Sequence, residues 1–155
     1  MSELEVRRLA VSDAPAVSAL LAVDPPDYGR HFQPFSTDPT EIASEIGRAE
    51  RDRYWGLFTD GALAGLLMLR GLDAGYVGPA FGVYVAHDLS GKGLGTVALA
   101  FAQAWCRLNG CPEIMLTVHP DNADARRMYE RDGFVADGER SGVGHLIYRK
   151  RLAEE

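Results

Sequence analysis

The sequence predicts a mixed β-sheet with helices on its faces, an α/β architecture, and three observations lead to this fold class. Two apolar runs, at residues 54–59 and 62–69, are separated by Asp60-Gly61, a strong hairpin signal because both turn positions tolerate positive φ. Strand and helix patterns then alternate through residues 76–131. Two further strand patterns follow. Hairpins supply antiparallel strands and strand-helix-strand units supply parallel ones, so one mixed sheet should contain both.

The amino-terminal part predicts a strand and two helices before the hairpin. Residues 4–9 form a short strand pattern, and Ser12 then has the residue type of a helix N-cap. The helix after it carries apolar residues at helical spacing: Val17, Leu20, Leu21 and Val23. A second helix is expected to begin at Asp38 or Thr40 and to run to about Glu50.

The elements after the hairpin are expected, in chain order, as a strand at 76–86, a helix at 93–109, a strand at 113–118, a helix at 121–131 and strands at 133–137 and 143–152. The strand at 76–86 contains Gly78, Pro79 and Gly82, which favour a bulge or a splayed strand. Gly110 ends the long helix.

Length and composition predict one soluble domain covering residues 1–155. Hydrophobic residues make up 46% of the chain and charged residues 25%, an ordinary balance for a globular protein. The net charge of -6, without a basic stripe, argues against nucleic-acid binding and suits a cationic substrate. No signal peptide precedes Leu4, and no apolar run reaches the ~18 residues of a membrane span, so a cytoplasmic protein with no membrane partner is expected.

The two cysteines, Cys106 and Cys111, lack the spacing and the histidine partners of a zinc site, and two cysteines are too few for a disulfide framework. We expect buried reduced thiols and no metal. Cys106 is a poor nucleophile candidate, because no neighbour in sequence would lower its pKa.

The segment from Ser90 to Gly95, SGKGLG, joins a strand directly to a helix. A helix start leaves about four unpaired N–H groups beside the positive end of the helix dipole, where anions bind. Glycine at positions 91, 93 and 95 removes the Cβ atoms that would keep a pyrophosphate from the backbone. The alternative is a simple glycine turn, but such a turn rarely needs three alternating glycines.

Two common phosphate loops fit this segment poorly. A Walker loop needs Ser or Thr after Gly-Lys, and here Gly93 follows Lys92. A dinucleotide fingerprint needs two residues between its second and third glycines and an acid at the far end of the next strand, whereas Glu113 begins that strand. NAD is therefore disfavoured as the ligand.

The loop resembles that of the GNAT superfamily of acetyl-CoA-dependent N-acetyltransferases, whose pattern is Arg/Gln-x-x-Gly-x-Gly/Ala. Gly93 and Gly95 match it, and Ser90 replaces the usual Arg or Gln. A second signature of the superfamily, Asn-x-x-Ala-x-x-x-Tyr followed by Gly-Phe, stands here as Asn122, Ala125, Tyr129, Gly133 and Phe134. The resemblance covers residues 76–134 well.

The resemblance implies a mostly antiparallel sheet with a splayed central pair of parallel strands, here 83–86 and 114–119, and helices on both faces. The pantetheine arm of acetyl-CoA would lie between these strands. The residues implied for acetyl-CoA binding are Val83, Val85, Ser90, Gly91, Lys92, Gly93, Leu94, Gly95, Thr96, Asn122 and Arg126. For three of them a structural role is an alternative: Asn122 as a helix cap, and Lys92 and Arg126 as solvated side chains.

The resemblance also implies direct acetyl transfer to a primary amine of a small molecule, an amino sugar or a protein N-terminus. Tyr129 would be the general acid, since a phenol with a pKa of about 10 stays protonated at neutral pH. Helical spacing alone also allows Tyr129 as a core aromatic. The splayed strand contains no acid, so the base is open among His119, Asp73 and an ordered water chain.

Residues 24–39 show no period and collect four aromatic rings, Tyr28, His31, Phe32 and Phe35, which form either a small satellite core or a wall of the acceptor pocket. Acetyl-CoA and an amine acceptor are the expected partners, and a homodimer is compatible with the sequence.

Overall fold

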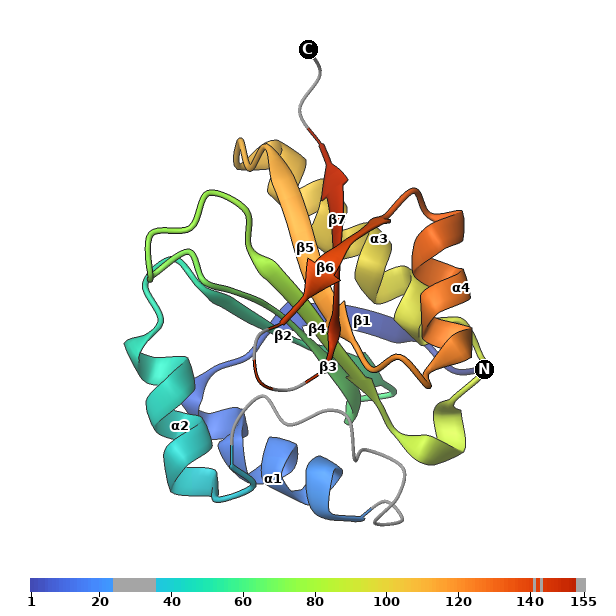
Figure 1. Cartoon of the computed structure of the whole chain (residues 1–155). Coiled ribbons are helices and arrows are strands. Elements are labelled where there is room, and N and C mark those ends of the chain that lie inside the picture. The colour runs from blue at the N-terminus through green and yellow to red at the C-terminus, as the bar shows by residue number, and fades with distance from the viewer. Residues whose placement is uncertain (24–35, 141, 143, 153–155) are drawn as a thin grey trace.

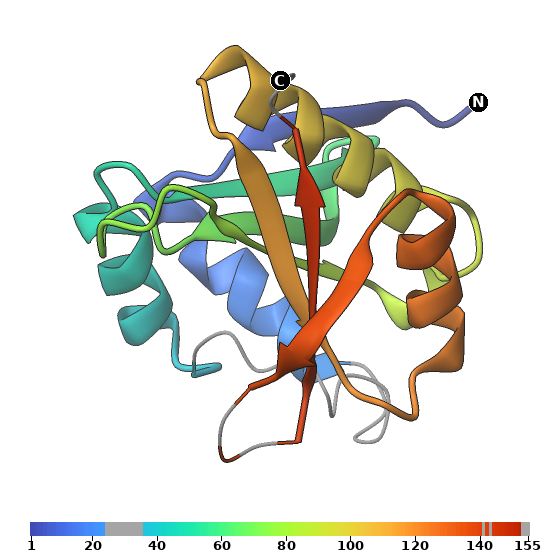
Figure 2. The ribbon, with the colours of Figure 1, turned by 45° about the horizontal axis from the view of Figure 1, so that its top comes forward.

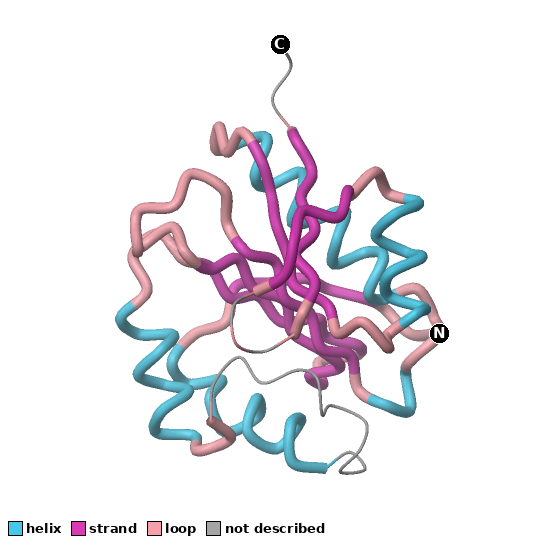
Figure 3. The backbone as a smooth tube through the Cα atoms, viewed as in Figure 1, coloured by secondary structure: helices cyan, strands magenta, loops and turns pink. Residues whose placement is uncertain are grey.

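A computed structural model describes residues 1–23, 36–140, 142 and 144–152. Its centre is a seven-stranded mixed sheet with the strand order β1-β2-β3-β4-β5-β7-β6. The strands are β1 Leu4–Arg8, β2 Arg53–Thr59, β3 Ala62–Arg70, β4 Ala80–Val85, β5 Glu113–Val118, β6 Val135–Glu139 and β7 Leu146–Arg151. Figure 3 shows them crossing the middle of the molecule, with helices around them. The predicted mixed sheet is confirmed.

All neighbouring strands are antiparallel except β4 and β5, which are parallel. They pair at one position only, Ala80 opposite Met115. Beyond it the two strands separate toward their carboxyl ends, and Figure 2 shows β5 running away from β4 to join β7. This is the splayed parallel pair that the resemblance implies.

Helices cover both faces of the sheet (Figures 1 and 2). On one face, α1 (Ala14–Val23) and α2 (Pro39–Arg48) bury Val17 and Ile42 against alternate strand residues. On the other, α3 (Leu94–Leu108) and α4 (Ala123–Arg131) pack Leu99 and Tyr129 on the opposite set. Strand side chains alternate between faces, so Leu67 belongs to the α3 core and its neighbour Met68 to the α1 core.

Several local signals act as predicted. Asp60 and Gly61 both have positive φ, 51° and 84°, as a two-residue hairpin turn of this kind requires. Asp38 caps α2 by accepting the N–H of Thr40 at 2.7 Å, which decides between the two expected starts. Gly110, with φ of 72°, follows the end of α3.

Two expectations about boundaries are wrong. Ser12 does not cap α1, because a 3₁₀ turn over Val11–Asp13 precedes the helix and the Asp13 carboxylate accepts the N–H of Ala10 at 2.7 Å. The strand expected from residue 76 begins only at Ala80, since Tyr76 donates its N–H to the Gly71 carbonyl at 3.0 Å and so closes a turn. No helix in the described ranges is long and apolar enough to cross a membrane.

Candidate functional site

The glycine loop forms an exposed arch of backbone between β4 and α3. Its first residue, Ser90, donates its hydroxyl to the carbonyl of His87 at 2.7 Å and so caps the preceding 3₁₀ turn. Gly91 and Gly93 have φ of 77° and 89°, the left-handed region that favours glycine. The first helical bond is donated by Val97 to the Gly93 carbonyl, and in the described part of the chain no backbone group accepts the N–H groups of residues 91–96.

Gly95 borders open space above this loop. Its φ does not require glycine, and a Cβ built on it would meet no described atom within 4 Å. Alanine would therefore fit there and would favour the helix. The glycine leaves the unpaired N–H groups of the loop open to close approach by a ligand. The arrangement fits an anion such as a pyrophosphate.

The other residues implied by the loop divide between core and surface. Leu94 is half-buried against the α3 core. Thr96 directs its hydroxyl toward the Met128 sulfur of α4, 3.9 Å away, so its side chain contacts protein. Lys92 is exposed. The backbone, rather than these side chains, supplies the donors of the loop.

The splay offers backbone hydrogen-bonding groups of β4 to a bound molecule. Ala86 donates its N–H to the Ala64 carbonyl at 2.8 Å, so this pair is hydrogen-bonded within the β3–β4 arrangement. Hydrogen-bonded and non-bonded pairs alternate along antiparallel strands. The backbone groups of Val83 and Val85 therefore point toward β5, into the splay, as expected for groups that would pair with a pantetheine amide.

Tyr129 lies on α4 and is buried in the core between this helix, α3 and the sheet. Its ring packs against Phe134, with ring centroids 5.8 Å apart, and burial raises the pKa of its hydroxyl to about 12. The hydroxyl has no hydrogen bond to another described residue. Every fully buried side-chain oxygen of the described residues has a hydrogen-bond partner. The Tyr129 hydroxyl has none, so it is not fully buried. Tyr129 thus combines a packed ring with an available, protonated hydroxyl.

Two other residues on this helix have structural contacts. The Asn122 side chain caps α4 by accepting the N–H of Ala125 at 3.3 Å. Arg126 donates to the Tyr148 hydroxyl at 3.2 Å and to the Pro120 carbonyl at 3.1 Å. The bond to Tyr148 is the main cause of the raised pKa of its guanidinium. The Tyr148 bond ties α4 to β7. The cap favours the structural alternative for Asn122, whereas Arg126 is bonded to protein rather than solvated.

His119 follows the carboxyl end of β5, on the sheet face opposite α3. Counting along the parallel strands from the Ala80–Met115 pair places it level with Tyr84, beside the open part of the splay. Its Nδ1 accepts the N–H of Asp121 at 3.1 Å, so the neutral ring carries its proton on Nε2. In that form Nε2 is a hydrogen-bond donor. His145 lies across the strands, with ring centroids 5.6 Å apart.

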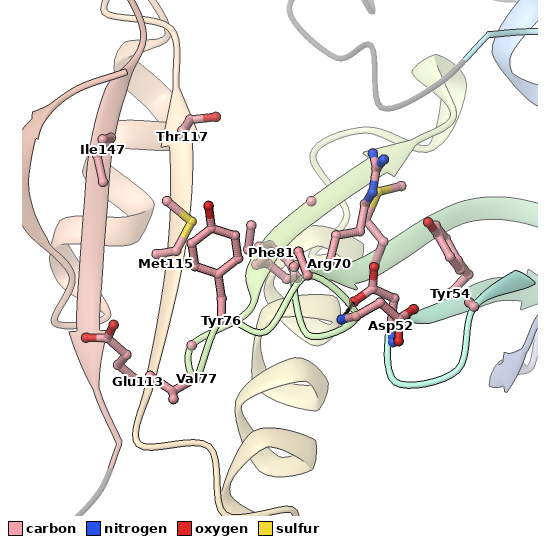
Figure 4. A pocket seen from close by; sticks show the side chains of 18 of the residues that line it. Asp52, Tyr54, Arg70, Tyr76, Val77, Phe81, Glu113, Met115, Thr117 and Ile147 are labelled. Carbon is pink, nitrogen blue, oxygen red and sulfur yellow. Dashed lines mark hydrogen bonds between the residues drawn. The ribbon is translucent and has the colours of Figure 1, made fainter. Parts of the chain in front are cut away.

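An open cavity of about 1480 Å³ lies on this same face. It runs over β3, β4, β5 and β7 from the end of α2 (Figure 4). Sequence reasoning missed its lining residues, among them Arg70, Tyr76, Met115, Thr117, His145 and Ile147. The available signal was strand alternation: Ile114, Leu116 and Val118 are buried in the α3 core, so the residues between them face away from it.

Asp73 also lines this cavity, but its carboxylate is engaged in hydrogen bonds to the backbone of residues 50–52. It accepts the N–H groups of Glu50, Arg51 and Asp52 at 3.1, 2.6 and 3.3 Å. The Arg51 bond is the main cause of its lowered pKa. A carboxylate stabilised in its charged form is a weak proton acceptor, so the geometry disfavours Asp73 as the base.

The remaining candidates add no further chemistry. Burial raises the pKa of the Cys106 thiol to about 12, which leaves it un-ionised at neutral pH. Among the described residues no three His, Cys, Asp or Glu side chains gather as a metal site. The aromatic residues of the proposed acceptor wall, Tyr28, His31, Phe32 and Phe35, lie outside the described residues.

Comparison with known proteins agrees with this geometry. The profile of the Acetyltransferase (GNAT) family matches residues 16–134. Comparison with curated protein sequences finds no significant match. Two similar solved structures are the PaiA N-acetyltransferase from Thermoplasma acidophilum in complex with coenzyme A (TM-score 0.77, 18% identity, 96% of this chain and 99% of that one) and the ribosomal-protein-S18-alanine N-acetyltransferase from Escherichia coli (0.75, 20%, 99% and 96%). A third is a spermidine N-acetyltransferase chimera from Vibrio cholerae and hSSAT (0.75, 22%, 94% and 92%). All three share the fold described above.

Proposed function

The chain belongs to the acetyltransferase (GNAT) family with acetyl-CoA as its acyl donor, and on that premise we propose that it transfers the acetyl group directly to a primary amine. The observation that carries the proposal is the loop at residues 90–95. Its unpaired N–H groups and the uncovered Gly95 lie just after β4, at the open end of the splay. A long thioester can thus place its pyrophosphate on the loop and its pantetheine arm between the strands.

The acceptor enters from the other face of the sheet in this proposal. The cavity over β4 and β5 reaches Gly82 and Thr117, which are level with each other on either side of the splay. An amine in the cavity can therefore approach a thioester carbonyl held beside Val83 and Val85. The N–H of Val83, which is directed into the splay, polarises that carbonyl.

Proton transfer is divided between the two faces. The amine nitrogen forms a bond to the acetyl carbon, and the carbon–sulfur bond breaks. Tyr129 gives its proton to the departing sulfur, since a phenol is protonated at neutral pH. We assign the proton lost by the amine to water in the open cavity. His119, with its proton on Nε2, is proposed as a hydrogen-bond donor on the acceptor side.

Binding selectivity tests the donor site. Acetyl-CoA at about 100 times its Kd should stabilise the protein by roughly 2.7 kcal/mol and raise Tm by about 5–10 °C, whereas NAD and ATP at equal concentration should not. Differential scanning fluorimetry measures the shift, and titration calorimetry supplies the Kd. Equal stabilisation by NAD, or none by acetyl-CoA, would remove the basis of the proposal.

A further inference from the structure

The acceptor cavity is longer than a small amine requires. It follows β5 from Glu113 to Thr117 and reaches His145, beside His119. Positions 113 and 117 are four residues apart along extended strand, a span of about 13 Å. The volume of about 1480 Å³ also exceeds the roughly 300–1,000 Å³ that small-molecule sites commonly have. A small amine at the splay would leave most of this surface in water.

The middle of the cavity is apolar, although it lies on the surface. Figure 4 shows Tyr76 beside Met115, with Val77 below them and Ile147 on the neighbouring strand. Tyr76 and Val77 are 67% and 66% exposed, and both line the cavity. Such exposed apolar side chains surrounded by polar residues are typical of a surface that binds a ligand. Along the chain, Met115 lies two residues from Thr117 and four residues from His119, about 7–13 Å from the open splay.

The charged side chains of the cavity argue against a polyamine. Four arginines line it, namely Arg48, Arg70, Arg140 and Arg149. Most of the lining acids already have partners: Glu45 pairs with Arg48, and Glu113 with Arg149. Asp52 and Asp73 accept backbone N–H groups. Arg48 and Arg149 are neutralised in the same ion pairs, so what a chain of ammonium groups lacks here is a row of unpartnered carboxylates beside the apolar wall.

An amino sugar is disfavoured by the same wall. Its hydroxyls need a close set of hydrogen-bonding partners. Thr117 and His145 lie at the splay, but the wall beyond them, formed by Met115, Val77 and the Tyr76 ring, is mostly apolar. An extended polypeptide suits the cavity better. It advances about 3.3–3.6 Å per residue, so its third and fourth residues reach the apolar wall when its α-amine lies at the splay.

We propose that the acceptor is the α-amine of a polypeptide, bound in an extended form along β5 with apolar side chains at its third and fourth positions against Tyr76, Val77, Met115 and Ile147. The proposal rests on the acetyl transfer proposed above and identifies its acceptor. Beyond this wall the cavity lining becomes charged, with Arg70 and Asp52 among its residues.

Acceptor length and sequence provide the first test. Release of the CoA thiol is measured with alanine amide, a tetrapeptide amide carrying leucine at positions 3 and 4, the same peptide with aspartate there, spermidine and glucosamine. The leucine peptide should exceed alanine amide in kcat/KM by about 10²-fold, and the aspartate peptide should lose about tenfold. If spermidine, glucosamine or alanine amide were acetylated with a kcat/KM equal to that of the leucine peptide, the proposal would be wrong.

A matched pair of variants provides the second test. Val77→Asp places a carboxylate in the apolar wall, and Val135→Asp makes the same change at a residue of equal exposure, 68%, outside the cavity. Val77→Asp should raise KM for the leucine peptide about tenfold, with KM for acetyl-CoA unchanged. Val135→Asp should change neither. If both variants behaved alike with unaltered Tm, the wall would not bind the acceptor.

The two proposals fail in different ways. If acetyl-CoA binds but short amines are preferred, the peptide acceptor is wrong and acetyl transfer stands. If no amine in the panel, peptide or small, releases thiol from a protein that stays folded, acetyl transfer itself is wrong.

Discussion

Tyr129→Phe should lower kcat by about 10²-fold and leave the Kd for acetyl-CoA within about twofold of the wild-type value. The change removes one hydroxyl and keeps the ring, so the contact with Phe134 survives. The loss belongs to kcat because the proton is needed only as the carbon–sulfur bond breaks. A thiolate leaves partly unassisted, which places the effect at the low end of general-acid contributions, about 10²–10⁴.

Thermal stability separates this chemical role from packing. The Tyr129 hydroxyl has no hydrogen bond to another described residue, so its removal should leave Tm unchanged or slightly higher. Stopped assays at saturating acetyl-CoA, paired with a thermal melt, distinguish the two roles. A wild-type kcat in a folded variant would make Tyr129 a core aromatic.

Gly95→Asp should weaken acetyl-CoA binding by about 10²-fold or more, because it places a carboxylate where the pyrophosphate would meet the N–H groups of the loop. Gly95→Ala should weaken it less, through bulk alone. The alanine variant has a second expected effect of opposite sign. Its Cβ meets no described atom, and alanine favours a helix by up to about 0.5–1 kcal/mol, so the unliganded protein should melt slightly higher.

Ser90→Ala is the control for this series. The Ser90 hydroxyl is bonded to the His87 carbonyl, so its loss should cost stability of about 0.5–1.5 kcal/mol and leave acetyl-CoA affinity nearly unchanged. Titration calorimetry on Gly95→Asp, Gly95→Ala and Ser90→Ala ranks their Kd values for acetyl-CoA directly. Weaker binding by Ser90→Ala than by Gly95→Asp, with both folded, would mean that a side chain rather than the backbone holds the phosphates.

Much of the fold could be predicted because its signals are local. The strand expected at 113–118 is the observed Glu113–Val118, and the Asp60-Gly61 turn has the positive φ values that its residue types allow. The error at residues 76–79 has a physical reason. Tyr76 and Val77 have the apolar character of a strand, but they line the acceptor cavity and are mostly exposed.

Part of the candidate site could also be predicted from local sequence, and part could not. The loop at 90–95 is contiguous, so its spacing could be recognised, and Tyr129 stands in a signature with fixed intervals. Arg126 could not be assigned from helix position, because its partners Tyr148 and Pro120 are set by how α4 packs on β7. The cavity could not be predicted either, since residues such as Arg70 and His145 meet only once the register of the strands is fixed.

The most direct measurement of the central claim compares CoA release with acetylation of the acceptor in one reaction. The protein is incubated with acetyl-CoA and the leucine tetrapeptide amide, free thiol is measured by a colorimetric reagent, and the peptide is analysed by mass spectrometry. Direct transfer predicts one acetyl group on the peptide α-amine for each thiol released, and little thiol without the peptide. Thiol release that does not depend on the amine, or an acetyl group that remains on the protein, would contradict it.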